Sequence, residues 1–176
     1  MTPHDAIAAA LERVQSVLRR KPEVGLHDDA PATARWQGGT RMTVHHANGT
    51  ALPTDMPAEL GGTGDQVTPG WLFRAGLSSC AATSILLQAV QSGVALTRLE
   101  VRATSRSDTR GLLGMADADG QPVPAGPCGV TLEVSLAADG GVPPERLRAL
   151  VHGALGHSPV PCAVRVATPM DLRIEA

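Results

Sequence analysis

The chain has 176 residues, enough for one domain with a buried core, and 43% of them are hydrophobic and 18% charged. Fifteen basic and seventeen acidic residues give a net charge of -2, so no basic patch for nucleic acid is expected. Trp36, Trp71 and Phe73 are the only aromatic residues. They are too few to form the aromatic platforms on which the bases of single-stranded nucleic acid stack. The composition therefore predicts a protein without a nucleic-acid partner.

The N-terminal segment is predicted to form an amphipathic helix over residues 3–20. Thr2 is a suitable N-cap, and apolar residues recur at helical spacing at Ile7, Leu11, Val14 and Leu18. Acidic residues in its first turns and the lack of an apolar run argue against a signal peptide. Three cysteines without a CxxC pair fit a reducing compartment, so a cytoplasmic location is expected.

Two short strands are expected next, over residues 31–36 and 40–47. Gly38-Gly39 lies between them, and this pattern is typical of a hairpin. Residues 51–67 contain two prolines and three glycines and are predicted to form one long loop. Loops of this length in a compact domain are often functional.

A central helix is predicted over residues 69–91, with Thr68 as N-cap and Pro69 in the first turn. Residues 75–97 carry no charge, but their many serine, threonine and glutamine residues exclude a membrane span. The helix is therefore expected to be buried inside protein. Because one chain of this size cannot surround such a helix, we expect a homodimer that buries it between two subunits.

The second half of the chain alternates strands and helices, which makes the predicted class α+β. The expected order is a strand at 96–106, a loop at 108–127, a strand at 130–136, a helix from 143 to about 155 and a final strand near 170–174. No repeat of 20–50 residues is visible.

The histidines and glycine-rich turns do not match a metal or cofactor site. His45 and His46 are neighbours on a predicted strand and point to opposite faces, whereas His152 and His157 are five residues apart, off one helical face. Gly61-Gly62-Thr63-Gly64 is not followed by the Lys-Ser/Thr of a P-loop. No metal and no cofactor is predicted.

Cys80 lies in the middle of the predicted central helix and has two interpretations. A free cysteine is commonly a small buried packing residue. Alternatively it is a nucleophile, which requires a cation or hydrogen-bond donors near its thiolate, and Arg35 and Arg41 are the candidate cations. Cys128, at the start of a strand, is interpreted as a structural residue.

Several motifs in order resemble the OsmC/Ohr family. They are the glycine-rich loop at 59–64, Thr68-Pro69, the alanine-rich helix around Cys80, and Ser158-Pro159-Val160. The resemblance covers roughly residues 31–175. It implies an N-terminal helix and linker at 1–30 and an OsmC-like domain at 31–176, with antiparallel sheets wrapped around long central helices in an intertwined dimer.

The resemblance also implies a chemistry, the reduction of organic or inorganic hydroperoxides. In the family a reactive cysteine, Cys80 here, attacks the peroxide and becomes a sulfenic acid. A second cysteine, Cys162 here, captures it as a disulfide that an external thiol reduces. The family arginine falls on Arg41, with Arg35 as a rival.

Two positions depart from the family pattern. The peroxidase glutamate, ten residues before the cysteine, is Gly70, and Asp55, Glu59 and Asp65 are the possible substitutes. At the position before a proline where the family usually has its second cysteine, this chain has Ser158, which is interpreted as a helix N-cap. Cys162 follows four residues later.

Three functional hypotheses therefore remain open. The first is a thiol-dependent hydroperoxide reductase. The second is a non-peroxidatic family member that binds a small apolar ligand at the dimer interface. The third is an α+β domain without a reactive thiol, which leaves the ordered motif match unexplained.

Overall fold

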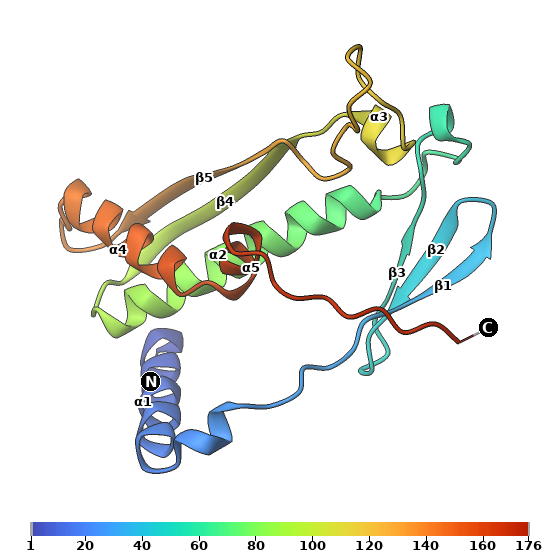
Figure 1. Cartoon of the computed structure of the whole chain (residues 1–176). Helices are drawn as coiled ribbons and strands as arrows, with labels where there is room; N and C mark the ends of the chain where they lie inside the picture. The colour runs from blue at the N-terminus through green and yellow to red at the C-terminus, as the bar shows by residue number, and fades with distance from the viewer. Residues whose placement is uncertain (1, 176) are drawn as a thin grey trace. The chain divides into compact units, whose positions relative to one another are not determined.

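Helices and antiparallel strands alternate along residues 2–175, the part of the chain that the computed structural model describes (Figure 1). The α+β class is confirmed. The elements are α1 Pro3–Arg20, η1 Pro22–Gly25, β1 Thr33–Gly38, β2 Arg41–His45, β3 Ala51–Thr54, η2 Ala58–Leu60, α2 Pro69–Gln91, β4 Leu96–Arg106, α3 Thr109–Leu112, β5 Gly129–Ala138, α4 Pro144–Gly156 and α5 Pro159–Arg165.

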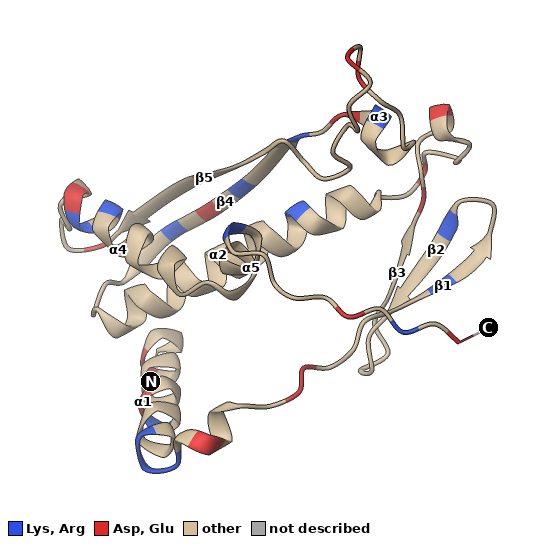
Figure 2. Ribbon diagram, viewed as in Figure 1, with Lys and Arg blue, Asp and Glu red and all other residues tan. Residues whose placement is uncertain are grey.

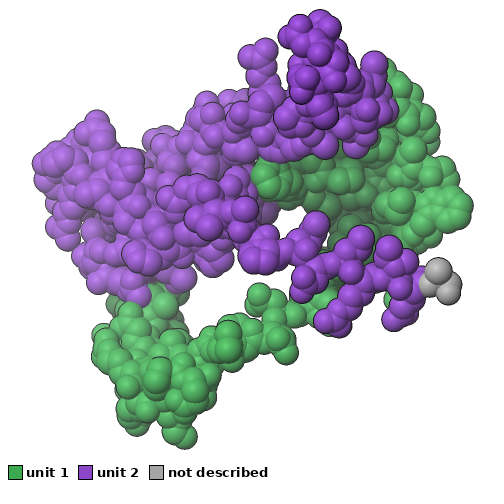
Figure 3. Space-filling model, viewed as in Figure 1, with its two compact units in different colours: residues 1–73 green, residues 74–176 purple. Residues whose placement is uncertain are grey.

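The chain forms two compact units, Met1–Phe73 and Arg74–Ala176, and the boundary falls inside α2 (Figure 3). They are called unit 1 and unit 2 below. The domain division implied by the resemblance, 1–30 and 31–176, stays a prediction, and its two outermost residues lie outside the described part of the chain.

The predicted N-terminal helix is confirmed as α1. Its start is fixed by a capping box, in which Thr2 Oγ1 accepts a hydrogen bond from the Asp5 N–H (3.1 Å) and Asp5 Oδ2 accepts one from the Thr2 N–H (2.8 Å). No residue of α1 is buried, and Val14 of its apolar stripe is 55% exposed. Local capping therefore sets this helix, without a packed core beneath it.

The three strands of unit 1 form an antiparallel sheet in the order β1-β2-β3. The predicted hairpin is confirmed, with Gly38 and Gly39 in the left-handed region at φ 102° and 55°. The prediction of a loop over all of 51–67 is wrong for its first four residues, because Ala51–Thr54 pairs with β2. Pro53 fits there because β3 is an edge strand, where a missing N–H removes no ladder bond.

The loop that follows β3 is closed at both ends. Thr54 forms an isolated bridge with Val67, and the Asp55 N–H donates to the Val67 carbonyl (3.1 Å). The short helix η2 lies within the loop, and Gly61 ends it with φ 82°. The loop thus returns to the end of β3 before α2 begins.

The hydrophobic core of the described chain lies in unit 2. There α2 and α4 pack against the two-stranded antiparallel sheet of β4 and β5 (Figure 1). The predicted strands at 96–106 and 130–136 and the helix after Pro143 are confirmed. The core residues are Ile85, Ala89, Val94, Leu150 and Ala154.

One stripe of α2 is buried, with Leu77, Ala81, Ile85 and Ala89 at intervals of four residues. Arg74 is the sole charged residue of α2, visible as one blue segment on a tan helix (Figure 2). Within the single chain one sheet and α4 cover only one face of α2, and Leu86 stays 37% exposed, so burial of this helix by a second subunit stays a prediction. Among residues 2–175, no helix is long and apolar enough to cross a bilayer.

The predictions for the second half of the chain need two corrections. The segment 108–127 contains a short helix, α3, which Asp108 caps by accepting from the Arg110 N–H (3.0 Å). The strand expected at 170–174 is wrong, because 166–175 carries no regular structure and joins neither sheet of the described chain. Alternating apolar residues of this tail, Met170, Leu172 and Ile174, are 78–91% exposed.

Candidate active site

Cys80 is held by two hydrogen-bonding groups from the segment that begins α5. Its Sγ lies 3.4 Å from the Ser158 hydroxyl oxygen and accepts a hydrogen bond from the Val160 N–H at 3.4 Å. Cys80 itself is positioned by α2, which starts as predicted where Thr68 Oγ1 accepts from the Trp71 N–H (3.1 Å). The contact joins residues 78 positions apart in the chain.

Ser158 has the backbone position of a helix N-cap but not the side-chain role that the sequence predicts. Its φ and ψ are extended and α5 begins at Pro159, yet its hydroxyl makes no capping hydrogen bond. The N–H of Val160 is one of the groups that a capping side chain ordinarily satisfies. Here the sulfur of Cys80 accepts it instead, and the fully buried Ser158 hydroxyl meets the same sulfur.

This arrangement suits a nucleophilic sulfur. A hydroxyl and a backbone N–H both reach one sulfur, and such groups can donate hydrogen bonds to a sulfur that attacks an electrophile. Cys80 is only partly buried, so a small reagent has a route to it. The geometry is therefore compatible with covalent chemistry at Cys80.

Cys162 has different partners from Cys80. Its Sγ donates to the Gly156 carbonyl at 3.4 Å, and the Arg165 guanidinium donates to that sulfur at 3.2 Å. Both cysteines are free thiols. Cys128 is also free and is exposed, with its Sγ donating to the Arg106 carbonyl at 3.3 Å.

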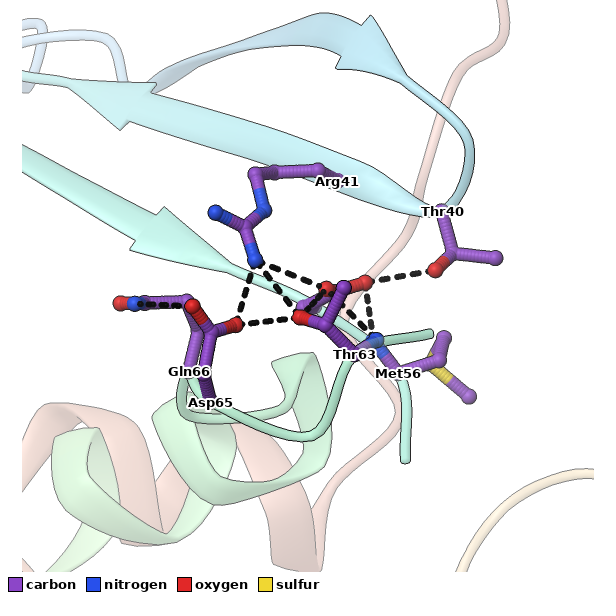
Figure 4. A network of polar contacts seen from close by, with 7 residues as sticks. Thr40, Arg41, Met56, Thr63, Asp65 and Gln66 are labelled. Carbon is purple, nitrogen blue, oxygen red and sulfur yellow. Dashed lines mark hydrogen bonds and ion pairs between the residues drawn. The ribbon is translucent and has the colours of Figure 1, made fainter. Parts of the chain in front are cut away.

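Arg41 is the centre of a polar network in unit 1 (Figure 4). Its Nη2 donates to Thr63 Oγ1 (2.7 Å), to Asp55 Oδ2 (3.2 Å) and to Asp65 Oδ1. Arg41 begins β2, and its partners come from the closed loop after β3. The rival candidate, Arg35, is exposed on β1 and forms no ion pair with any residue of the described range.

Asp55 is the buried anchor of this network, with its side chain 2% exposed. It accepts hydrogen bonds from the Thr40 hydroxyl (2.5 Å), the Thr63 hydroxyl (2.7 Å) and N–H (3.1 Å), and the Met56 N–H (2.8 Å). The Thr40 hydrogen bond, followed by those from Thr63, lowers the pKa of the Asp55 carboxyl well below its usual value. Asp55 is therefore ionised near neutral pH and pairs with Arg41.

Asp65 is the outer partner of Arg41, with its side chain 52% exposed. Hydrogen bonds from the Thr63 hydroxyl and the Gln66 amide, and then the charge of Arg41, lower the pKa of this carboxyl. The Thr63 hydroxyl has one hydrogen and serves either Asp55 or Asp65 at a given moment. Of the three acidic candidates in the loop, Asp55 and Asp65 contact Arg41, whereas exposed Glu59 belongs to η2 outside the network.

The glycines of the loop allow this close packing. A Cβ at Gly62 would lie 1.8 Å from the Met56 carbonyl oxygen and 2.9 Å from Asp55 Oδ1. The Gly-Gly-Thr-Gly run is recognisable in the sequence, whereas no sequence motif marks Thr63 and Thr40 as the hydrogen-bond donors to Asp55. Within residues 2–175, no three His, Cys, Asp or Glu side chains are grouped to hold a metal ion.

The three predicted site residues thus have well-defined surroundings in their own units. Arg41 lies in unit 1, and Cys80 and Cys162 lie in unit 2. Their common role in one site stays a prediction.

Comparisons with known proteins identify the family. The family model of OsmC-like proteins matches residues 62–173, more than half of the chain. A search of curated proteins finds no match. The chain belongs to the family of OsmC-like proteins, as the motifs around Cys80 predict.

Solved structures agree on the fold. An OsmC-like protein from Mycoplasma pneumoniae is 15% identical with a TM-score of 0.66, covering 81% of this chain and 91% of its own. An organic hydroperoxide resistance protein from Elizabethkingia anophelis is 24% identical with a TM-score of 0.58, covering 81% and 91%. The organic hydroperoxide resistance protein OhrB from Bacillus subtilis is 21% identical with a TM-score of 0.51, covering 80% and 93%. The chain therefore shares the OsmC/Ohr fold.

Proposed function

We propose that this protein reduces organic hydroperoxides with Cys80 as the nucleophile and a thiol as the reductant. The observation that carries the proposal is the sulfur of Cys80, which meets the Ser158 hydroxyl and the Val160 N–H, each at 3.4 Å. Two of the structural relatives above are named organic hydroperoxide resistance proteins. Both the fold and the local chemistry support this reaction.

The proposed first step oxidises Cys80 by two electrons. The thiolate sulfur attacks one peroxide oxygen, the O–O bond breaks, and an S–O bond forms. The remaining alkoxide takes a proton and leaves as an alcohol, so Cys80 becomes a sulfenic acid and the hydroperoxide is reduced. In this proposal Arg41, half-exposed and held by Asp55 and Asp65, binds the peroxide and stabilises the developing charge.

The proposed second step returns the sulfenic acid to a thiol. A thiol attacks the sulfenic sulfur, an S–S bond forms, and water leaves. An external dithiol then reduces that disulfide by two successive exchanges and is itself left as a disulfide. We propose Cys162 as the first of these thiols, which requires its sulfur to leave Gly156 and Arg165 after Cys80 is oxidised.

Turnover measurements with matched cysteine variants test the first step. Consumption of cumene hydroperoxide, a fatty-acid hydroperoxide and H₂O₂ is measured with dithiothreitol or dihydrolipoamide as reductant. We expect Cys80→Ser to abolish turnover and Cys128→Ser, at an exposed cysteine with only a backbone partner, to retain it. Full turnover by Cys80→Ser would contradict the proposal, and no turnover by the native chain would favour the non-peroxidatic alternative.

Peptide mapping without reductant tests the second step. After one equivalent of hydroperoxide we expect a Cys80–Cys162 disulfide in the native chain and a persistent sulfenic acid in Cys162→Ser. Ser158→Cys in the Cys162→Ser background is a positive control, because position 158 already faces the sulfur of Cys80 at 3.4 Å. A persistent sulfenic acid in the native chain would leave an external thiol as the resolving group.

A further inference from the structure

A small apolar pocket lies in unit 2, and neither Ser158 nor Val160, the two contacts of the Cys80 sulfur, belongs to its lining. Its volume is about 250 Å³, and residues of α2, β5, α4 and α5 each contribute to its wall. Leu77 is almost fully buried and Pro161 is buried, so part of the wall belongs to the packed interior. The lining residues are Leu77, Val130, Leu132, Leu155, Pro161, Val164 and Arg165.

Arg165 is the only charged residue of this lining. Its Nη2 donates to the Leu155 carbonyl at 2.7 Å and to the Cys162 sulfur at 3.2 Å. These contacts fix one end of the guanidinium, which has five N–H donors in total. The remaining donors have no protein acceptor within the described chain.

The charge of Arg165 is not neutralised by the protein. No carboxylate in residues 2–175 forms an ion pair with it, whereas Arg41, Arg102 and Arg110 each have one. A guanidinium binds carboxylates through two parallel hydrogen bonds. An unpaired guanidinium beside six apolar side chains is therefore complementary to a molecule with a carboxylate head and an apolar tail.

We propose that this pocket binds a short aliphatic carboxylate, with the carboxylate on Arg165 and the chain between Leu77, Leu132 and Val164. A volume of about 250 Å³, at about 30 Å³ for each water-sized group, suits a chain of about eight carbons. The apolar chain loses its contact with water, and the carboxylate replaces the missing anion of Arg165.

The proposal does not rest on peroxide reduction, because it uses no property of Cys80. It does have a consequence for Cys162, whose sulfur is 3.2 Å from the Arg165 guanidinium. A bound carboxylate on Arg165 covers this thiol. Ligand binding is therefore expected to slow alkylation of Cys162 and leave that of Cys128 unchanged.

Calorimetric titration of the Cys80→Ser chain with octanoate tests the proposal without any peroxidase chemistry. We expect saturable binding in the millimolar range or tighter. Octanol, which lacks the charge, is expected to bind at least about tenfold more weakly, since a hydrogen bond to a charged group is stronger than one between neutral groups. Hexanoate is expected to bind roughly tenfold more weakly, because it buries two fewer methylene groups.

Arginine variants locate the bound carboxylate. Arg165→Gln keeps a long polar side chain without the charge and is expected to weaken octanoate binding at least about tenfold. The matched control is Arg148→Gln on α4, in the wall of a different cavity beside Val134 and His152, and we expect unchanged binding. Iodoacetamide labelling of Cys162 with and without octanoate gives a second measurement on the same chain.

Three results would overturn the proposal. The first is no saturable octanoate binding, and the second is equal binding by Arg165→Gln and the native residue. The third is dissociation of a dimer by octanoate at matched occupancy, which would show that a second copy of the chain fills the pocket. Loss of peroxidase activity in the native protein would leave the titration result unaffected, so the two proposals fail separately.

Discussion

The hydroxyl oxygen of Ser158 lies 3.4 Å from the sulfur of Cys80. Ser158 is fully buried and α2 holds Cys80 partly buried, so the packing of unit 2 fixes the pair. At the position where relatives are expected to carry a second cysteine, this chain therefore has a hydrogen-bonding partner for the first one.

Ser158→Ala removes one of the two hydrogen-bonding partners of the Cys80 sulfur. We expect the reaction of Cys80 with hydroperoxide or iodoacetamide to slow about tenfold, because a hydrogen bond to a charged group is worth about 1.5–3 kcal/mol. Ser79→Ala is the matched control, an exposed serine next to Cys80 on α2. Stopped-flow or mass-spectrometric labelling rates at fixed pH measure both. An unchanged rate in Ser158→Ala would remove the hydroxyl from the site.

Arg41→Ala tests whether the network of unit 1 serves Cys80. We expect peroxide turnover to fall on the order of 100-fold, as when one preorganised donor is lost from a reaction centre. Alkylation of Cys80 is expected to slow as well. Arg35→Ala, on the neighbouring strand, is expected to keep turnover near the native value. If the two variants exchange behaviour, Arg35 is the site arginine.

Asp55→Asn tests the buried anion through its dependence on pH. The pKa of Asp55 is lowered in the folded chain from a usual value of 3.8, so the unfolded chain binds the proton more readily. The stabilisation is therefore complete near neutral pH and is lost as pH falls below that value. We expect the unfolding free energy of the native protein to exceed that of Asp55→Asn at pH 7 and pH 5. This gap between the two proteins is expected to be smaller at pH 3.

Urea unfolding at the three pH values measures this gap, and Glu59→Gln is the control from the same loop. Glu59 is exposed and outside the network, so its substitution is expected to change stability little at any of them. A gap for Asp55→Asn that stays constant from pH 7 to pH 3 would show that its carboxylate charge is not what stabilises the loop.

Gly62→Ala is expected to destabilise the loop by about 1–3 kcal/mol, because its Cβ would meet the Met56 carbonyl oxygen at 1.8 Å. Arg41 and Asp55 depend on the same loop, so turnover is expected to fall with stability. Gly153→Ala in α4 has open space around its Cβ and is expected to stabilise by about 0.5–1 kcal/mol. Thermal unfolding compares the two, and equal effects would contradict the close packing at Gly62.

The homodimer stays a prediction. Substitutions in the C-terminal tail, whose apolar residues are exposed in the single chain, test it. Leu172 and Ile174 alternate with Arg173 and are 81% and 78% exposed, the pattern of a strand without a partner edge. We expect light scattering to show a dimer at micromolar concentration. Leu172→Lys is expected to weaken it and Arg173→Ala, at the neighbouring charged position, to leave it intact. A native monomer at this concentration would contradict the prediction.

The sequence by itself determined the elements whose signals are local. The capping box of Thr2 and Asp5 fixes the start of α1, and alternation fixes β4 at Leu96–Arg106, because such signals act within a few residues. The motif around Cys80 likewise predicted the family. The strand predicted near 170–174 does not form, because a strand depends on pairing with a distant segment. Residues 170–174 join neither sheet of the described chain.

Only the tertiary structure decided which partners the site residues have. Ser158 has the sequence signature of an N-cap, yet its hydroxyl faces Cys80 because α2 and α5 pack together. The sequence did not distinguish Asp55, Glu59 and Asp65 as replacements for the family glutamate. Closure of the loop between Thr54 and Val67 places Asp55 and Asp65, but not Glu59, in contact with Arg41. Contacts between residues far apart in the chain depend on packing, which no short stretch of sequence specifies.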